Sequence, residues 1–363
     1  MRPIAIGVSA LLGVAALVGL AGETRAARPA GNANNPPPLS VKEAVEHGAQ
    51  WIASVQGRDG GWGQDGGETS YVRLGERLES NGNDVANTAV AVLALRRAGN
   101  QYQTNIRRGL DFILSNVDAS RVDGLEITNR NGTQIQRKLG PFIDTFLTSM
   151  LLSEVDGTMD PQMNARVRRA LQKCVTKIQN SQQRDGSWNI SGGWAPVLGT
   201  SMASRSLYVA QSKGVAVETR VMDRADTYTK SAMNAPASQA AAGVALYQSA
   251  QALEQLSRTE KDRKANAPQI SAIKAQLADQ RFVDGFGSVG GEEFFSYLNM
   301  SDGLRRAGGP EWTKWHAELT DKILKMQNED GTWAGHHCIT GRVAVTSAAI
   351  LNLMVDHEPV HNN

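Results

Sequence analysis

The chain has 363 residues, of which 41% are hydrophobic and 20% are charged. Its 38 basic and 36 acidic residues give a net charge of +2, so composition provides no general attraction to nucleic acid, and no nucleic-acid partner is expected. These values describe an ordinary globular protein with one large domain or two small ones.

The N-terminus has the pattern of a signal peptide. Arg2 precedes an apolar run from Ile4 to Ala21, and small residues after this run fit cleavage after Ala26. A retained membrane anchor is the alternative, because the run is nearly long enough to span a bilayer. We expect residues 1–26 to be removed and the mature chain to have no transmembrane segment. The expected location is the periplasm or the extracellular space.

Residues 27–39, rich in Gly, Asn and Pro, are expected to form a flexible linker before a helical domain at 40–357. Ser40 and Glu43 form a capping box, and Asp160 followed by Pro161 marks another helix start. The segment 258–264 is expected to be a solvated connector, and 358–363 a C-terminal tail. Helical periodicity predicts six helix pairs, in chain order 40–56 with 84–98, 105–117 with 143–155, 161–183 with 200–213, 218–233 with 238–256, 268–280 with 292–307, and 310–327 with 342–356.

One seven-residue pattern, Gln-x-x-Asp-Gly-x-Trp, occurs three times, at Gln56–Trp62, Gln182–Trp188 and Gln327–Trp333. Asp-Gly is a turn signal, because Asp bonds the backbone ahead of it and Gly accepts positive φ. Gln can bond exposed helix-end groups, and Trp can pack its ring against the neighbouring repeat. We interpret these segments as clasps between helical hairpins and use that name below.

The clasp resembles the QW motif of squalene and hopene cyclases and of related prenyltransferase-type α/α toroids. The resemblance covers most of residues 40–357 and implies an all-α (α/α)6 toroid with a central cavity. It does not by itself imply cyclase chemistry. The second helix of each pair is rich in Ala, Ser, Thr and Gly, which agrees with an inner ring whose backbones approach closely. An open helical repeat array is the alternative.

In a closed ring the clasps lie at one mouth, where the inner helices direct their N-termini into a common space. Capping of helix ends is the structural explanation for carboxylates there, and it is favoured for Asp84 and Glu292. The candidate binding residues at this mouth are Asp84, Asp144, Trp194, Glu292, Glu293, Tyr297, His336, His337 and Arg342.

The signatures of known toroid enzymes are incomplete. The cyclase acid motif Asp-x-Asp-Asp is absent from the chain. The resemblance to protein prenyltransferases, which bind zinc through Asp, Cys and His, places His337 near their His but supplies no matching Asp-x-Cys. No cofactor is therefore expected. Zinc at His337 and Cys338, helped by Glu292, Glu293 or Asp144, is the alternative.

Two hypotheses of function follow. The first is an exported module that binds a ligand or protein segment in the central cavity at the clasp mouth. The second is an enzyme with a non-standard site there, of cyclase, transferase, or polysaccharide lyase or hydrolase type. Convergence of Asp144, Glu293, His337 and Arg342 into one hydrogen-bonded cluster would favour the enzyme, and dispersed and solvated positions would favour the binding module.

Overall fold

The computed structural model describes residues 39–65, 71–73, 76–78, 82–190, 196–234, 244–279 and 290–357. The chain is all-α, as expected, and none of these described helices is long and apolar enough to cross a bilayer. In chain order the helices are α1 (Val41–Ser54), α2 (Val85–Ala98), α3 (Gln103–Ala119), α4 (Gln134–Leu139), α5 (Ile143–Val155), α6 (Pro161–Asn180), α7 (Pro196–Ser212), α8 (Thr219–Asn234), α9 (Val244–Leu256), α10 (Glu260–Ala265), α11 (Ala267–Ala278), α13 (Gly291–Ala307), α14 (Pro310–Lys325) and α15 (Arg342–Leu353).

The paired helices differ in how much of their surface is covered. α1 begins at the predicted capping box, and its buried residues, among them Ala44 and Ile52, lie on one face. In α2, by contrast, every residue from Val85 to Leu95 is buried. α1 is therefore an outer helix with one face in solvent, and α2 is an inner helix packed on all sides.

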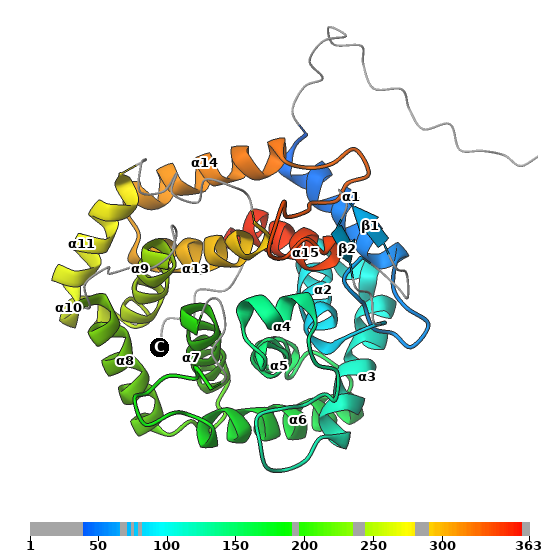
Figure 1. Ribbon diagram of the computed structural model, residues 1–363, viewed down its shortest axis with the longest axis horizontal. Coiled ribbons are helices and arrows are strands. Elements are labelled where there is room, and N and C mark those ends of the chain that lie inside the picture. Colours follow the sequence, from blue (N-terminus) through cyan, green and yellow to red (C-terminus); the bar gives the residue numbers. More distant parts are fainter. Residues whose placement is uncertain are drawn as a thin grey trace, which may run out of the picture. The chain divides into compact units, whose positions relative to one another are not determined.

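The inner helices contact one another in a cycle. α2 packs on α5, α5 on α7, α7 on α9, α9 on α13, α13 on α15, and α15 on α2 again. α1 also packs against α14 and α15, so the first and last helix pairs meet (Figure 1). This cycle, with α1, α3, α6, α8, α11 and α14 outside it, is the arrangement that an (α/α)6 toroid requires.

The clasp glutamines make the same two hydrogen bonds in each copy. Nε2 of Gln56 donates to the carbonyl of Gly60 in its own turn and to that of Asn105 in α3. Gln182 bonds Gly186 and Val221 of α8 in the same way, and Gln327 bonds Gly331 and Ala44 of α1, with all six donor–acceptor distances between 2.7 and 3.0 Å. Each clasp therefore fastens one outer helix to the next, and the third connects α14 to α1.

The clasp tryptophans are equally regular. Nε1 of Trp62, Trp188 and Trp333 donates at 2.7 Å to the carbonyl of the residue ten positions earlier, near the end of the preceding outer helix. A Cβ placed on Gly48 of α1 would lie only 2.9 Å from the Trp333 ring, so a glycine in the next outer helix makes room for the indole. The predicted role of the clasp, turn plus packing anchor, is thus observed in all three copies.

Three segments differ from the sequence expectation. The loop expected at 57–83 contains an antiparallel pair, β1 (Tyr71–Arg73) and β2 (Glu76–Leu78), in which Val72 pairs with Arg77. The loop expected after residue 117 contains α4, which a Thr133 capping box starts. The segment 258–264, which was expected to be a solvated connector, contains most of α10. The first residue of this connector, Arg258, is buried.

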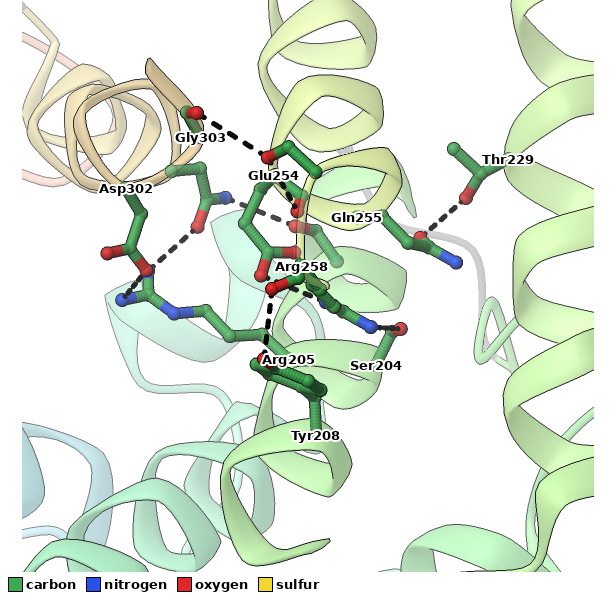
Figure 2. Close-up of polar contacts among 12 residues, drawn as sticks. Ser204, Arg205, Tyr208, Thr229, Glu254, Gln255, Arg258, Asp302 and Gly303 are labelled. Carbon is green, nitrogen blue, oxygen red and sulfur yellow. Dashed lines mark hydrogen bonds and ion pairs between the residues drawn. The ribbon is translucent and has the colours of Figure 1, made fainter. Parts of the chain in front are cut away.

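Arg258 is buried because it belongs to a charge network between α7, α9 and α13 (Figure 2). Its guanidinium and that of Arg306 contact the carboxylate of Glu254 at 2.7 and 2.9 Å, and Arg205 and Arg306 contact Asp302. Burial alone would raise the pKa of Glu254, but Arg258 and Arg306 outweigh burial and lower it to about 2. The network stays ionised and joins inner helices in a part of the ring where α8 and α9 have no clasp between them.

Candidate functional site

Two aspartates meet at the N-terminus of α2. Asp84 is the N-cap, and its Oδ1 accepts a hydrogen bond from the backbone N–H of Asn87 at 2.8 Å. Asp144, in the first turn of α5, accepts one from the backbone N–H of Ala86 at 3.0 Å and another from Nε2 of Gln136 at 2.6 Å. Both carboxyl groups are buried. Capping explains Asp84, and Asp144 caps a helix other than its own.

Burial raises the pKa of both acids, that of Asp84 to about 6 and that of Asp144 to about 7. For Asp144 the negative charge of Asp84 adds to the effect of burial, while the hydrogen bond from Gln136 opposes it. Both carboxyl groups therefore take up a proton at a higher pH than an exposed aspartate does, and Asp144 does so close to neutral pH.

A second group forms where the loop before α15 approaches the N-terminus of α13. Donor atoms of Glu292, His337 and Cys338 all lie within 4.8 Å of one another, and Nδ1 of His337 is 3.8 Å from Oε1 of Glu292. The Glu292 side chain is only 1% exposed. Among the described residues, neither of its carboxylate oxygens accepts a hydrogen bond from an N–H or O–H group, and the Cys338 thiol is its hydrogen-bonding neighbour. Oxygen, nitrogen and sulfur donors of this kind suit zinc.

The backbone around this group is specialised. Cys338 has a φ of 61°, and it is the only residue other than glycine with positive φ in the part of the chain that the structure describes. An L-residue in this conformation costs about 1–2 kcal/mol, so the surrounding contacts hold it there. A Cβ on Gly290 would lie 2.6 Å from both the Glu292 carboxylate and the His337 ring, so only glycine leaves space for the two side chains.

The Cys338 thiol faces a negative group. Burial raises its pKa to about 11, and the neighbouring Glu292 carboxylate adds to this shift, against the opposing influence of Lys138 on α4. In the absence of a cation the thiol therefore remains protonated at neutral pH.

Glu293 and Tyr297 lie together one turn along α13. Burial, followed by the charge of Glu292, raises the pKa of Glu293 to about 8, while a hydrogen bond with Tyr297 opposes the shift. The Tyr297 hydroxyl also accepts a hydrogen bond from Nζ of Lys322 at 2.9 Å, and burial raises the pKa of this phenol. Glu293 is thus a carboxyl group that is largely protonated at pH 7.

The remaining predicted site residues do not join these groups. Arg342 bonds Asp65 at 3.1 Å and Asp330 at 3.0 Å and lies over the Trp51 ring, so it fastens the start of α15 to the first and third clasp regions. His336 is exposed, and Trp194 lies outside the described residues. In the contacts described, Asp144, Glu293, His337 and Arg342 thus have different partners and do not form one hydrogen-bonded cluster. Because Asp144 and Glu293 are buried, these positions do not meet the expectation of dispersed and solvated side chains either.

The hollow at the centre of the inner helices is small. It is lined mainly by apolar side chains such as Leu147, Met202, Phe295 and Leu351, with Arg205 at one side, and its volume is about 30 Å³. That is room for about one water molecule. Among the described residues, this hollow therefore offers little space for a larger ligand.

Sequence reasoning missed the polar side chains of α4. Gln134 contacts the loop before α15, and Gln136 contacts Asp144, yet this segment was expected to be a loop. The sequence pattern Thr133-x-x-Gln136 is a capping-box signal, and it could have located the start of this helix. No local pattern indicated the partnership of Asp65 with Arg342, because the two residues are 277 positions apart.

The comparisons with known proteins cover part of this architecture. Residues 33–131, which include the first clasp and α2, match the family described as squalene-hopene cyclase C-terminal domain. A squalene–hopene cyclase from Bradyrhizobium diazoefficiens is 34% identical over 71 residues, which make up 20% of this chain and 10% of that protein. The match thus spans about a tenth of the curated relative's length. Together with the repeated clasp, these similarities support the squalene/hopene cyclase-like superfamily for this chain.

Proposed function

We propose that the chain is an exported ligand-binding protein whose clasp mouth holds a transition-metal ion of the zinc class through Glu292, His337 and Cys338. One observation carries this proposal. The Glu292 carboxylate is buried, has no N–H or O–H donor among the residues that the structure describes, and faces an imidazole and a thiol. A buried carboxylate whose hydrogen-bonding partner is only a weak thiol donor is costly, and a bound cation would offset that cost.

The donor set fits such an ion. Donors around tetrahedral zinc lie roughly 3.3–3.8 Å apart, given zinc–ligand bonds of about 2.0–2.3 Å. The three donor atoms here lie within 4.8 Å of one another, so a contraction of the order of 1 Å brings them into range. Three protein donors leave a fourth position open, as in zinc sites that bind water or substrate.

The open position favours a ligand at the mouth. When bound, the ion would attract an anionic or thiol group or polarise a carbonyl or phosphoryl oxygen. The chain's own residues orient this position, because Gly290 lets His337 approach Glu292 and the N-terminal dipole of α13 stabilises the carboxylate. The small central hollow supports the same placement, since the described residues leave little space there for a ligand of several atoms.

Metal binding can be measured on the purified mature chain by isothermal titration with zinc. We expect about one ion per chain, and Glu292→Gln should weaken binding by at least tenfold because it removes the charged ligand. Glu318→Gln, which changes an exposed glutamate of α14, is the matched control and should bind as the wild type does. Absence of stoichiometric zinc binding by the wild type would overturn the proposal.

An enzyme at the same mouth is the second candidate, and Glu293 is the observation in its favour. Its carboxyl group is largely protonated at pH 7 and adjoins Glu292, so it has the ionisation state of a general acid. A Glu293→Gln variant that retains zinc affinity but loses turnover of a bound ligand would support the enzyme. Equal turnover by the variant and the wild type would reject Glu293 as the acid.

Export is proposed from the N-terminal pattern alone. Arg2, the apolar run and the small residues before Ala27 support cleavage after Ala26. Mass spectrometry of the protein recovered from culture medium and periplasm should find a mature chain that begins at Ala27. An intact N-terminus in the membrane fraction would show a retained anchor instead.

A further inference from the structure

The short helix α4 touches both groups of mouth residues. On one side, Gln136 donates its hydrogen bond to Asp144 at 2.6 Å. On the other, Gln134 reaches the loop before α15, where Nε2 donates to the Thr340 hydroxyl at 2.9 Å. Oε1 of Gln134 accepts hydrogen bonds from the backbone N–H groups of Thr340 at 2.9 Å and Gly341 at 3.1 Å. One side-chain amide thus makes three hydrogen bonds to a segment more than 200 positions away.

The segment that Gln134 holds is the one that presents the thiol. Thr340 and Gly341 follow Cys338 by two and three residues, and Cys338 has the left-handed backbone conformation described above. Because that conformation is unfavourable for cysteine, the loop needs contacts from elsewhere to maintain it. The Gln134 amide fixes the two backbone N–H groups that come directly after the turn.

The remaining residues of α4 account for its packing. Ile135 and Leu139 are buried, whereas Gln134 is half-buried and its side chain makes only these polar contacts among the bonds described. Loss of the Gln134 amide therefore removes the contact to the loop and leaves the apolar attachment of α4 in place. This separation makes a positioning role testable apart from the fold.

We infer that Gln134 is a positioning residue for the metal centre, acting through Thr340 and Gly341 on the geometry of His337 and Cys338. This inference rests on the proposed metal binding. Residues that orient metal ligands from a second layer typically change affinity by 10–100-fold when they are removed. A loop freed from Gln134 should let Cys338 relax out of its left-handed conformation and move the sulfur away from Glu292.

Cobalt(II) titration tests this inference, because sulfur coordination gives a near-ultraviolet charge-transfer absorption that a change in stability alone does not alter. For Gln134→Ala we expect at least a tenfold loss of cobalt affinity and a weaker sulfur-to-cobalt absorption at saturation. Gln134→Glu should restore both, since a carboxylate accepts from the two backbone N–H groups and the Thr340 hydroxyl can donate to it. Gln103→Ala, at an exposed position of α3, is the control.

The outcomes separate the two proposals. If wild-type protein shows no cobalt absorption, the metal centre itself is wrong. If the wild type binds cobalt and Gln134→Ala binds it with equal affinity and an identical spectrum, the metal centre stands and the role of Gln134 is refuted. Should Gln134→Ala fail to fold in the presence of a chelator, Thr340→Val decides. That variant removes the hydroxyl contact to Gln134 and keeps both backbone N–H contacts, so it should show a smaller loss in the same direction. Unchanged cobalt binding would refute the role of Gln134.

Discussion

Gln327→Ala tests whether the third clasp holds the last outer helix to the first. The substitution removes two hydrogen bonds of 2.9 Å, one to Ala44 of α1 and one to Gly331 in the clasp turn. With a net contribution of about 1 kcal/mol for each bond, the free energy of unfolding should fall by about 2 kcal/mol. For a domain of this size, that loss lowers Tm by about 4 °C.

Urea unfolding followed by far-ultraviolet circular dichroism measures this change. The control is Glu329→Ala, an exposed residue of the same clasp, which should alter the free energy of unfolding by no more than about 0.5 kcal/mol. Gln182→Ala should be at least as destabilising as Gln327→Ala, since it removes the same two hydrogen bonds and also the one that Arg224 donates to Oε1 of Gln182. If Gln327→Ala is no more destabilising than Glu329→Ala, the clasp glutamine does not fasten α14 to α1.

Three further predictions concern stability and the site. Glu254→Gln leaves two buried guanidinium groups without their shared carboxylate and should lower the free energy of unfolding in urea by about 3–5 kcal/mol. Glu260→Gln, which changes one member of an exposed ion pair, should lower it by under about 1 kcal/mol. Asp144 has a raised pKa of about 7, so the folded state holds its proton more tightly than the unfolded state and stability should fall as pH rises from about 4 to about 7. Asp144→Asn should flatten that fall, and an unchanged pH profile would argue against the raised pKa of Asp144. Cys338→Gly should change the free energy of unfolding of the metal-free protein by no more than about 1 kcal/mol, because relief of the unfavourable positive φ offsets the greater entropy of the unfolded chain. The same variant should abolish the sulfur-to-cobalt absorption.

The repeats could be predicted because their signals are local. Each clasp has its Gln, turn and Trp within seven residues, and the hydrogen bonds of Gln56 and Trp62 depend mainly on that local spacing. The capping box at Ser40 is local in the same way. Such features persist in any fold that places one hairpin beside the next, so the helical architecture was predictable from the sequence.

The site was less predictable because its partners are distant in the chain. Arg342 has the charge and position expected of a mouth residue, but Asp65 pairs with it across the junction of first and last hairpins. Arg258 stands in a charged stretch typical of a solvated connector, yet Glu254 and Arg258 form a buried pair one helical turn apart. The left-handed conformation of Cys338 also had no sequence signal, since positive φ is normally indicated by glycine.

Anomalous diffraction from crystals grown with zinc tests the metal centre most directly. Data collected on both sides of the zinc absorption edge should show one strong anomalous peak within bonding distance of Glu292, His337 and Cys338, and Cys338→Gly crystals should lose it or show it much weakened. A fully zinc-loaded protein with no peak at these three side chains, or with its peak elsewhere, would contradict the assignment.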